Sequence, residues 1–233
     1  MSRIWIAALG VLVLAGQLGG EPSPAERGDL FWDDFARASN KWQDLRAWGF
    51  GAWQLRDGIF VSKDDTTPEQ TLYAAAPVFH HAIVSRDCSV RFRYRPVTGS
   101  SYLFSINLRQ HGWDCYKFEV DDRGAVRIVK AVLGRMPQVL RESAPGAVCF
   151  GQWQWVRLDV RGERPLLLRA KVWQGGVRDE PPWFTVAARD EFPLPATQLG
   201  MTLNSQQAGG AYTAIDDFSV QSAVPPSSLW QWA

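Results

Sequence analysis

Three carboxylates lie close together in the segment FEVDDRG: Glu119, Asp121 and Asp122. Residues two apart on a β-strand project to the same side of the sheet, so Glu119 and Asp121 would share one face. Two carboxylates held about 5–5.5 Å apart can cleave a glycosidic bond, one as the nucleophile and the other as the acid. Arginine and glycine follow directly where a third carboxylate could stand, so the set is incomplete.

Because the set is incomplete, catalysis is the weaker interpretation of these carboxylates. Opposite charges on adjacent strands attract one another across a sheet. We therefore expect Glu119 and Asp121 to be charge partners of arginines on neighbouring strands. The candidate arginines are Arg91, Arg93 and Arg109.

Aromatic side chains beside polar strands form a second candidate site. The aromatic members are Trp48, Trp53, Tyr102 and Trp113, and the polar members are Arg91, Arg93, Asn107, Arg109 and Glu119. Sugars present apolar C–H faces that stack on aromatic rings, and hydroxyls that bond to amide, carboxylate and guanidinium groups. We predict that these nine residues contact a glycan, although a solvated charged face explains the alternation equally well.

Histidine and cysteine offer no recognisable catalytic or metal signature. The histidines stand in loop-like contexts without a serine or cysteine nucleophile pattern, and they are His80, His81 and His111. The cysteines lack the C-x-x-C spacing of zinc knuckles and redox pairs, and they are Cys88, Cys115 and Cys149. An oxidising compartment would allow one disulfide and one free thiol, with three pairings open.

The N-terminus has the layout of a secretory signal. Arg3 precedes an apolar run from Ile4 to Leu18, and small residues close the segment at about Gly20. The run is shorter than the roughly 20 residues of a membrane span, so an uncleaved anchor is the minority interpretation. We predict a signal peptide over residues 1–20 and export to the periplasm or the extracellular space.

Composition indicates a packed, electrically neutral protein. Hydrophobic residues make up 46% of the chain and charged residues 21%, close to ordinary globular proteins. Without residues 1–20, which hold one of the 25 basic residues, 24 basic face 24 acidic residues. This balance argues against a nucleic-acid partner and against general attraction to anionic membranes. Twelve tryptophans are more than core packing usually needs.

Apolar and polar residues alternate with period 2 in several stretches, which is typical of half-buried β-strands. Glycine-rich and proline-rich turns separate them, as in PVTGSS, DDRG and RGERP. The spacing predicts an antiparallel β-sandwich. The residues expected to face the core are Val90, Phe92, Tyr94, Phe104, Ile106, Leu108, Phe118, Val156, Leu158 and Val160.

The two ends of this region resemble concanavalin-A-like lectin/glucanase domains, a superfamily that includes laminin-G-like jelly rolls. The similar segments are LFWDDFARASNKWQ with GAWQLRDGIFVS, and WQWVRLDVRGERPLLLRAKVWQGG with QLGMTLNSQQAGGAYTAIDDFSV. The resemblance implies an all-β, two-sheet antiparallel jelly roll over residues 30–221, after a linker at 21–29. A proline-broken tail follows at 222–233 and is a candidate contact for a protein partner.

The catalytic motifs of that superfamily are incomplete in this chain. Its glucanases carry E-x-D-x-E or E-x-D-x-x-E, and only Glu119 and Asp121 match. Its lyases need Gln-x-His and Tyr-x-Lys, whereas here Tyr116 and Lys117 are adjacent and Gln-x-His does not occur. In 3-keto-glycoside hydrolases a Gly-Asn-Ser-Gly stretch stands where this chain has GSSYLFSINLRQ.

The resemblance also implies a structural metal. An Asp-Asp-Phe sequence occurs near each end of the region, and in this fold the first and last strands lie side by side. Calcium prefers several oxygen ligands, which such a junction can supply. We predict one structural Ca²⁺ with Asp34 and Asp217 among its ligands.

Three functions remain open from the sequence. The first is an exported, non-catalytic glycan-binding module. The second is a glycan-processing hydrolase of the same fold that acts through Glu119 or Asp121. The third is an exported structural subunit without a sugar ligand.

Overall fold

The computed structural model describes residues 29–34, 36, 42–43, 53–57, 59–62, 72–75, 78–79, 87–98, 101–111, 114–195, 200–208 and 210–222. The signal segment predicted at residues 1–20 lies outside this part of the chain. The same holds for the predicted linker up to residue 28 and for the tail after Ser222, so these predictions stay predictions. The first described strand begins at Asp29 and the last one ends at Ser222.

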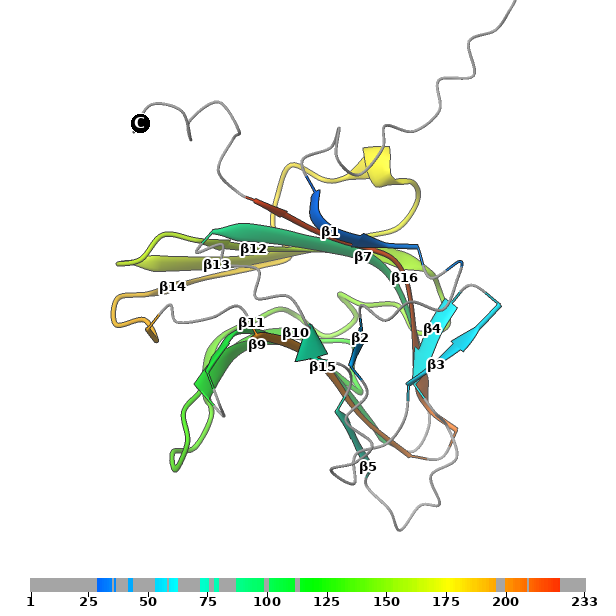
Figure 1. Cartoon of the computed structure of the whole chain (residues 1–233), viewed down its shortest axis with the longest axis horizontal. Coiled ribbons are helices and arrows are strands. Elements are labelled where there is room, and N and C mark those ends of the chain that lie inside the picture. Colours follow the sequence, from blue (N-terminus) through cyan, green and yellow to red (C-terminus); the bar gives the residue numbers. More distant parts are fainter. Residues whose placement is uncertain are drawn as a thin grey trace, which may run out of the picture.

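One layer of the structure is an eight-stranded antiparallel sheet (Figure 1). Its strands are β1 (Asp29–Asp33), β3 (Trp53–Arg56), β4 (Ile59–Ser62), β7 (Cys88–Val97), β12 (Gln154–Arg161), β13 (Leu166–Trp173), β14 (Val186–Asp190) and β16 (Tyr212–Ser222). Their order is β14-β13-β12-β7-β16-β4-β3. β1 pairs with the last part of β16, beyond the two residues that pair with β4.

The second layer is a six-stranded antiparallel sheet with the order β11-β10-β9-β8-β15-β5. Its strands are β5 (Leu72–Ala75), β8 (Ser101–His111), β9 (Asp114–Asp121), β10 (Val126–Ala131), β11 (Gln138–Glu142) and β15 (Gly200–Ala208). The short strands β2 (Trp42–Gln43) and β6 (Val78–Phe79) pair with each other, and β6 lies against β15. The chain is thus an all-β sandwich of two antiparallel sheets.

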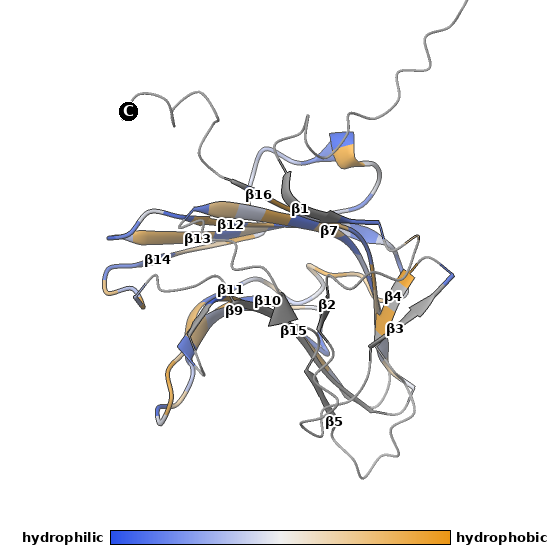
Figure 2. Cartoon of the chain, viewed as in Figure 1, coloured by the Kyte–Doolittle hydropathy of each residue, from blue (hydrophilic) through white to orange (hydrophobic). Residues whose placement is uncertain are grey.

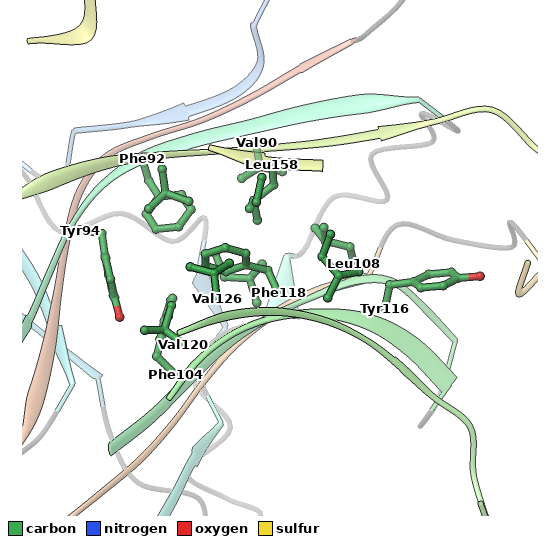
Figure 3. Close-up of a cluster of buried hydrophobic side chains, with 14 of the residues drawn as sticks. Val90, Phe92, Tyr94, Phe104, Leu108, Tyr116, Phe118, Val120, Val126 and Leu158 are labelled. Atoms are coloured by element: carbon green, nitrogen blue, oxygen red, sulfur yellow. The ribbon is translucent and has the colours of Figure 1, made fainter. Parts of the chain in front are cut away.

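Period-2 alternation decides which side of each strand is buried. Hydrophobic and hydrophilic residues alternate along the eight-stranded sheet, as Figure 2 shows. All ten residues that the sequence predicts for the core are buried, which confirms that prediction. Side chains from both sheets meet between the layers, with Tyr94 of β7 stacked on Phe104 of β8 at 5.0 Å between ring centres (Figure 3).

The six-stranded sheet is bent, and its convex face points to the core (Figures 1 and 3). Its outer face is therefore concave. The segment containing the 3₁₀ turn η2 (Val177–Asp179) crosses the outer face of the eight-stranded sheet. Glu180, directly after η2, holds this segment to the sheet by ion pairs with Arg157 and Lys171.

Hydroxyl groups join the two layers inside the core. Tyr94 of β7 and Tyr102 of β8 share a hydrogen bond of 2.6 Å between their hydroxyls, and Tyr102 also bonds to Thr213 of β16 at 2.8 Å. Burying these polar groups costs little because they satisfy one another.

The three cysteines are free thiols. Burial raises the pKa of Cys88 to about 12 and that of Cys115 to about 11. These two thiols therefore stay protonated near neutral pH and pack as small apolar side chains. Within the described ranges, no helix is long and apolar enough to cross a membrane.

Candidate ligand-binding site

The β9–β10 turn fixes the first of the two predicted carboxylates. Oδ1 of Asp121 accepts hydrogen bonds from the backbone N–H groups of Arg123 and Ala125, at 3.0 and 2.9 Å. Oδ2 accepts from Nε and Nη2 of Arg123, at 3.0 and 2.8 Å. Burial alone would raise the pKa of Asp121, but these hydrogen bonds outweigh burial and hold the pKa below its ordinary value. Asp121 is thus an ionised turn residue with both oxygens occupied.

Glu119 has a different environment on the same strand. Its nearest cations are Lys117, at 4.0 Å from Oε1, and Arg127, whose Nε lies 3.9 Å from Oε2. The carboxylate side chain is 12% exposed. Burial raises its pKa more than Lys117 and Arg127 lower it. A carboxyl group with a raised pKa on a concave face is a candidate functional group.

Strand register gathers further polar residues around Glu119. Ser105 of β8 pairs directly with Glu119, and Asn107 pairs with Lys117. On the other side, Arg127 of β10 pairs with Glu119. Directly paired residues share a face, so these five side chains lie together on the outer face of the six-stranded sheet. We call them the outer polar cluster: Ser105, Asn107, Lys117, Glu119 and Arg127.

These contacts correct the charge partners expected from the sequence. Glu119 pairs with Lys117 and Arg127, and Asp121 pairs with Arg123, so neither carboxylate pairs with the arginines named above. For Arg91 and Arg93 the reason is topological, because β7 belongs to the other sheet. Lys117 and Arg127 were not among the predicted ligand residues. The alternation in YKFEVDD already indicated the face of Lys117, whereas that of Arg127 depends on the register after the turn.

Arg91 and Arg93 lie on the opposite side of the molecule. Both alternate with buried residues of β7 and therefore belong to the outer face of the eight-stranded sheet. Arg93 lies over the ring of Trp153, with 4.9 Å from Cζ to the ring centre, and so does Arg95 at 5.0 Å. These arginines cannot reach the outer polar cluster, because the core separates the two faces.

Two other predicted ligand residues point into the interior. Tyr102 is buried, and its hydroxyl is bound by Tyr94 and Thr213. Arg109 is 3% exposed, and its Nη2 donates to the carbonyl of Gly162 at 3.0 Å and lies 3.7 Å from Asp87. A β-bulge between Leu108 and His111, with Arg109 at φ 49°, turns this side chain toward the other sheet.

The predicted tryptophans give no further information. Trp53 begins β3, but the structure does not describe its side chain, and Trp48 and Trp113 lie outside the described residues. Among the predicted ligand residues whose side chains the structure describes, Asn107 and Glu119 share the outer face of the six-stranded sheet. Arg91 and Arg93 share that of the other sheet.

Solved structures with this architecture share little sequence with the chain. The carbohydrate-binding module CBM66 from Bacillus subtilis is 12% identical with a TM-score of 0.52, and the match covers 74% of this chain and 92% of that one. The β-glucanase of Bacillus licheniformis is 9% identical with a TM-score of 0.53, and the match covers 82% of this chain and 97% of that one. The potassium-bound carbohydrate recognition domain of Emp46p is 11% identical with a TM-score of 0.57, and the match covers 84% of this chain and all of that one.

The chain has the concanavalin-A-like jelly-roll fold. No protein-family model and no curated protein matches its sequence. This fold carries lectins as well as glycosidases, so function has to be argued from the site.

The two Asp-Asp-Phe segments of this concanavalin-A-like chain do meet, as the sequence predicts. Asp33 at the end of β1 pairs with Phe218 in β16. The Emp46p domain has a metal-free form as well as the potassium-bound one, also 11% identical with a TM-score of 0.56. Among the residues that the structure describes, no group of three or more His, Cys, Asp or Glu side chains could hold a metal ion.

The carboxylates at this junction already have a cation. Nη1 of Arg93 lies 3.2 Å from Oδ2 of Asp216 and 3.6 Å from Oδ2 of Asp217. Calcium needs six to eight oxygen ligands without a competing positive charge. The side chains that the structure describes at this junction therefore do not fit the calcium ion that the sequence predicts at Asp34 and Asp217.

Proposed function

We propose that the chain is an exported, non-catalytic glycan-binding module, and that the outer polar cluster contacts the glycan. The cluster offers acceptors on Glu119 and donors on Lys117 and Arg127, while Ser105 and Asn107 are buried. Sugar hydroxyls donate and accept hydrogen bonds, so a patch of this kind suits them. The signal-like segment at residues 1–20 supports export.

The observation that carries the proposal is the unequal state of the two carboxylates. A retaining glycosidase needs two working carboxyl groups, one for attack and one for protonation. Both oxygens of Asp121 are held by the turn and by Arg123. Glu142 pairs with Arg127 and so belongs to the same face, but its Oε1 accepts a hydrogen bond from Nη2 of Arg123 at 2.8 Å. Arg123 thus holds both carboxylates that could act as a second catalytic group beside Glu119. Binding needs no such partner.

Fold similarity agrees with a glycan ligand without deciding between binding and hydrolysis. A carbohydrate-binding module, a carbohydrate recognition domain and a β-glucanase all share the architecture at TM-scores of 0.52–0.57. These ligands and activities are those of the three neighbours, not of this chain. All three neighbours recognise a carbohydrate, and this shared property is what supports glycan binding in our proposal.

Hydrolysis is the second candidate, and one observation favours it. The raised pKa of Glu119 is what a general acid requires. A hydrolytic mechanism would need a second carboxylate that Arg123 does not hold.

A glycan array on the full chain, paired with a reducing-sugar assay on every glycan that binds, tests the proposal. We expect retention of at least one glycan without release of reducing ends. Release of reducing ends that stops in Glu119→Gln would establish the hydrolase instead. If the array retains no glycan, the proposed function is wrong.

A further inference from the structure

A β-bulge brings two aspartates onto one face of β16. Asp216 pairs with Arg93 and Ser219 pairs with Arg91, so Asp217 and Phe218 together stand opposite a single residue of β7. Asp217 adopts φ 49°, and the extra residue shifts the alternation so that Phe218 is buried. Without the bulge, Asp217 would point into the core. With it, both carboxylates lie outward beside Arg93.

Arg93 is held where it can neutralise both carboxylates. Its Nη1 lies 3.2 Å from Asp216 and donates a hydrogen bond to it, and the same nitrogen lies 3.6 Å from Asp217. The ring of Trp153, directly before β12, lies under the guanidinium at 4.9 Å from Cζ to the ring centre. The side chain of Asp216 is 18% exposed, so its charge is screened only in part by water.

The guanidinium of Arg93 lowers the pKa of Asp216, which burial and neighbouring carboxylates raise. Burial is the largest cause that raises the pKa of Asp216, and the charge of Asp217 adds to it. Arg93 and the backbone N–H of Asp217 act in the opposite direction, and Asp34 raises the pKa slightly from the end of β1. Asp33 also ends β1, and β4 carries no titratable residue. Among the groups that the structure describes around Asp216, Arg93 is thus the cation beside several carboxylates.

We propose that the guanidinium of Arg93 is the built-in cation of the junction between the terminal strands, and that it takes the place the sequence assigned to calcium. A guanidinium is always charged and donates along fixed directions, so it can bridge two carboxylates permanently. A divalent ion at the same carboxylates would be repelled by it and would lose the lone pairs it needs. The junction is therefore independent of metal.

Melting curves of the full chain test this inference, with Arg95→Gln as the matched control. Arg95 lies on the same face of β7 and over the same Trp153 ring, and no ion pair with a described carboxylate is found for it. At pH 7 we expect Arg93→Gln to lower the melting temperature by roughly 2–4 °C more than Arg95→Gln. Arg93→Lys, which keeps the charge, should retain most of the wild-type value.

Chelator and added calcium should leave the wild-type melting curve unchanged, and elemental analysis should find no bound metal. A melting temperature that falls in chelator, or bound calcium at stoichiometric amounts, would overturn the inference. So would equal melting temperatures of Arg93→Gln and Arg95→Gln.

Discussion

Two carboxylates on one strand can have opposite titration behaviour. Glu119 and Asp121 are two residues apart on β9, yet burial raises the pKa of Glu119, while hydrogen bonds from Arg123 and Ala125 lower that of Asp121. The difference comes from the turn that follows Asp121, which supplies two backbone N–H groups to its side chain. The same functional group is thus fully hydrogen-bonded at Asp121, whereas at Glu119 it faces cations that lie 3.9 and 4.0 Å away.

Asp121→Asn tests this assignment through acid sensitivity. Because the folded pKa of Asp121 is lowered, its stabilisation is present above the ordinary aspartate pKa of about 3.9 and is lost as the pH falls through the folded pKa. We expect the melting temperature of the wild type to fall more steeply below about pH 4 than that of Asp121→Asn.

Asp122→Asn is the control for Asp121→Asn, since Asp122 is its exposed neighbour. It should keep the wild-type acid sensitivity. Asp190, whose pKa is also lowered, keeps its partners in all three proteins, so its contribution cancels in the comparison. If the melting temperatures of the two variants fall equally with pH, the stabilisation by Asp121 does not depend on its charge.

At the scale of elements, the β9–β10 turn requires a glycine at its last position. Gly124 has φ 69°, and a Cβ there would lie 2.4 Å from the carbonyl oxygen of Val148. The same approach lets Val148 donate its N–H to the carbonyl of Gly124 at 3.0 Å. The turn holds both Asp121 and the register of β10, and hence the position of Arg127 beside Glu119.

Gly124→Ala should destabilise the fold more than Gly146→Ala, measured by chemical denaturation. Gly146 also has positive φ, 77°, but a Cβ there would meet no atom within 4 Å. Gly146→Ala should therefore cost only the conformational strain, about 1–2 kcal/mol. Gly124→Ala adds a clash with rigid backbone, and equal losses in the two variants would contradict this account of the turn.

Alternation in the sequence predicts the strands and their buried sides, but not the bulges that change a side chain's direction. Every core residue expected from period 2 is buried, including Phe92 and Phe118. Arg109 and Asp217 depart from the simple pattern because each stands at a bulge with positive φ. A bulge inserts one residue without changing composition or spacing enough to be seen in a single sequence.

For the molecule as a whole, the sequence does not reveal which sheet a strand joins. β7 and β8 are consecutive and equally polar on one side, yet they belong to different layers. Arg91 and Arg93 therefore face away from Asn107 and Glu119, although one polar surface was expected. Non-local pairing sets this arrangement, and period 2 carries no information about it.

The central claim is that a glycan binds on the concave outer face of the six-stranded sheet. The most direct test is the dissociation constant of an array-selected glycan for the wild type, Lys117→Ala and Arg91→Ala, after circular dichroism confirms that each is folded. Lys117 belongs to the outer polar cluster, and Arg91 lies on the opposite face. Loss of a charge-assisted hydrogen bond costs about 1.5–3 kcal/mol, so Lys117→Ala should bind roughly tenfold or more weakly. Arg91→Ala should bind like the wild type. Weakened binding in Arg91→Ala together with unchanged binding in Lys117→Ala would place the ligand on the other sheet and contradict the account.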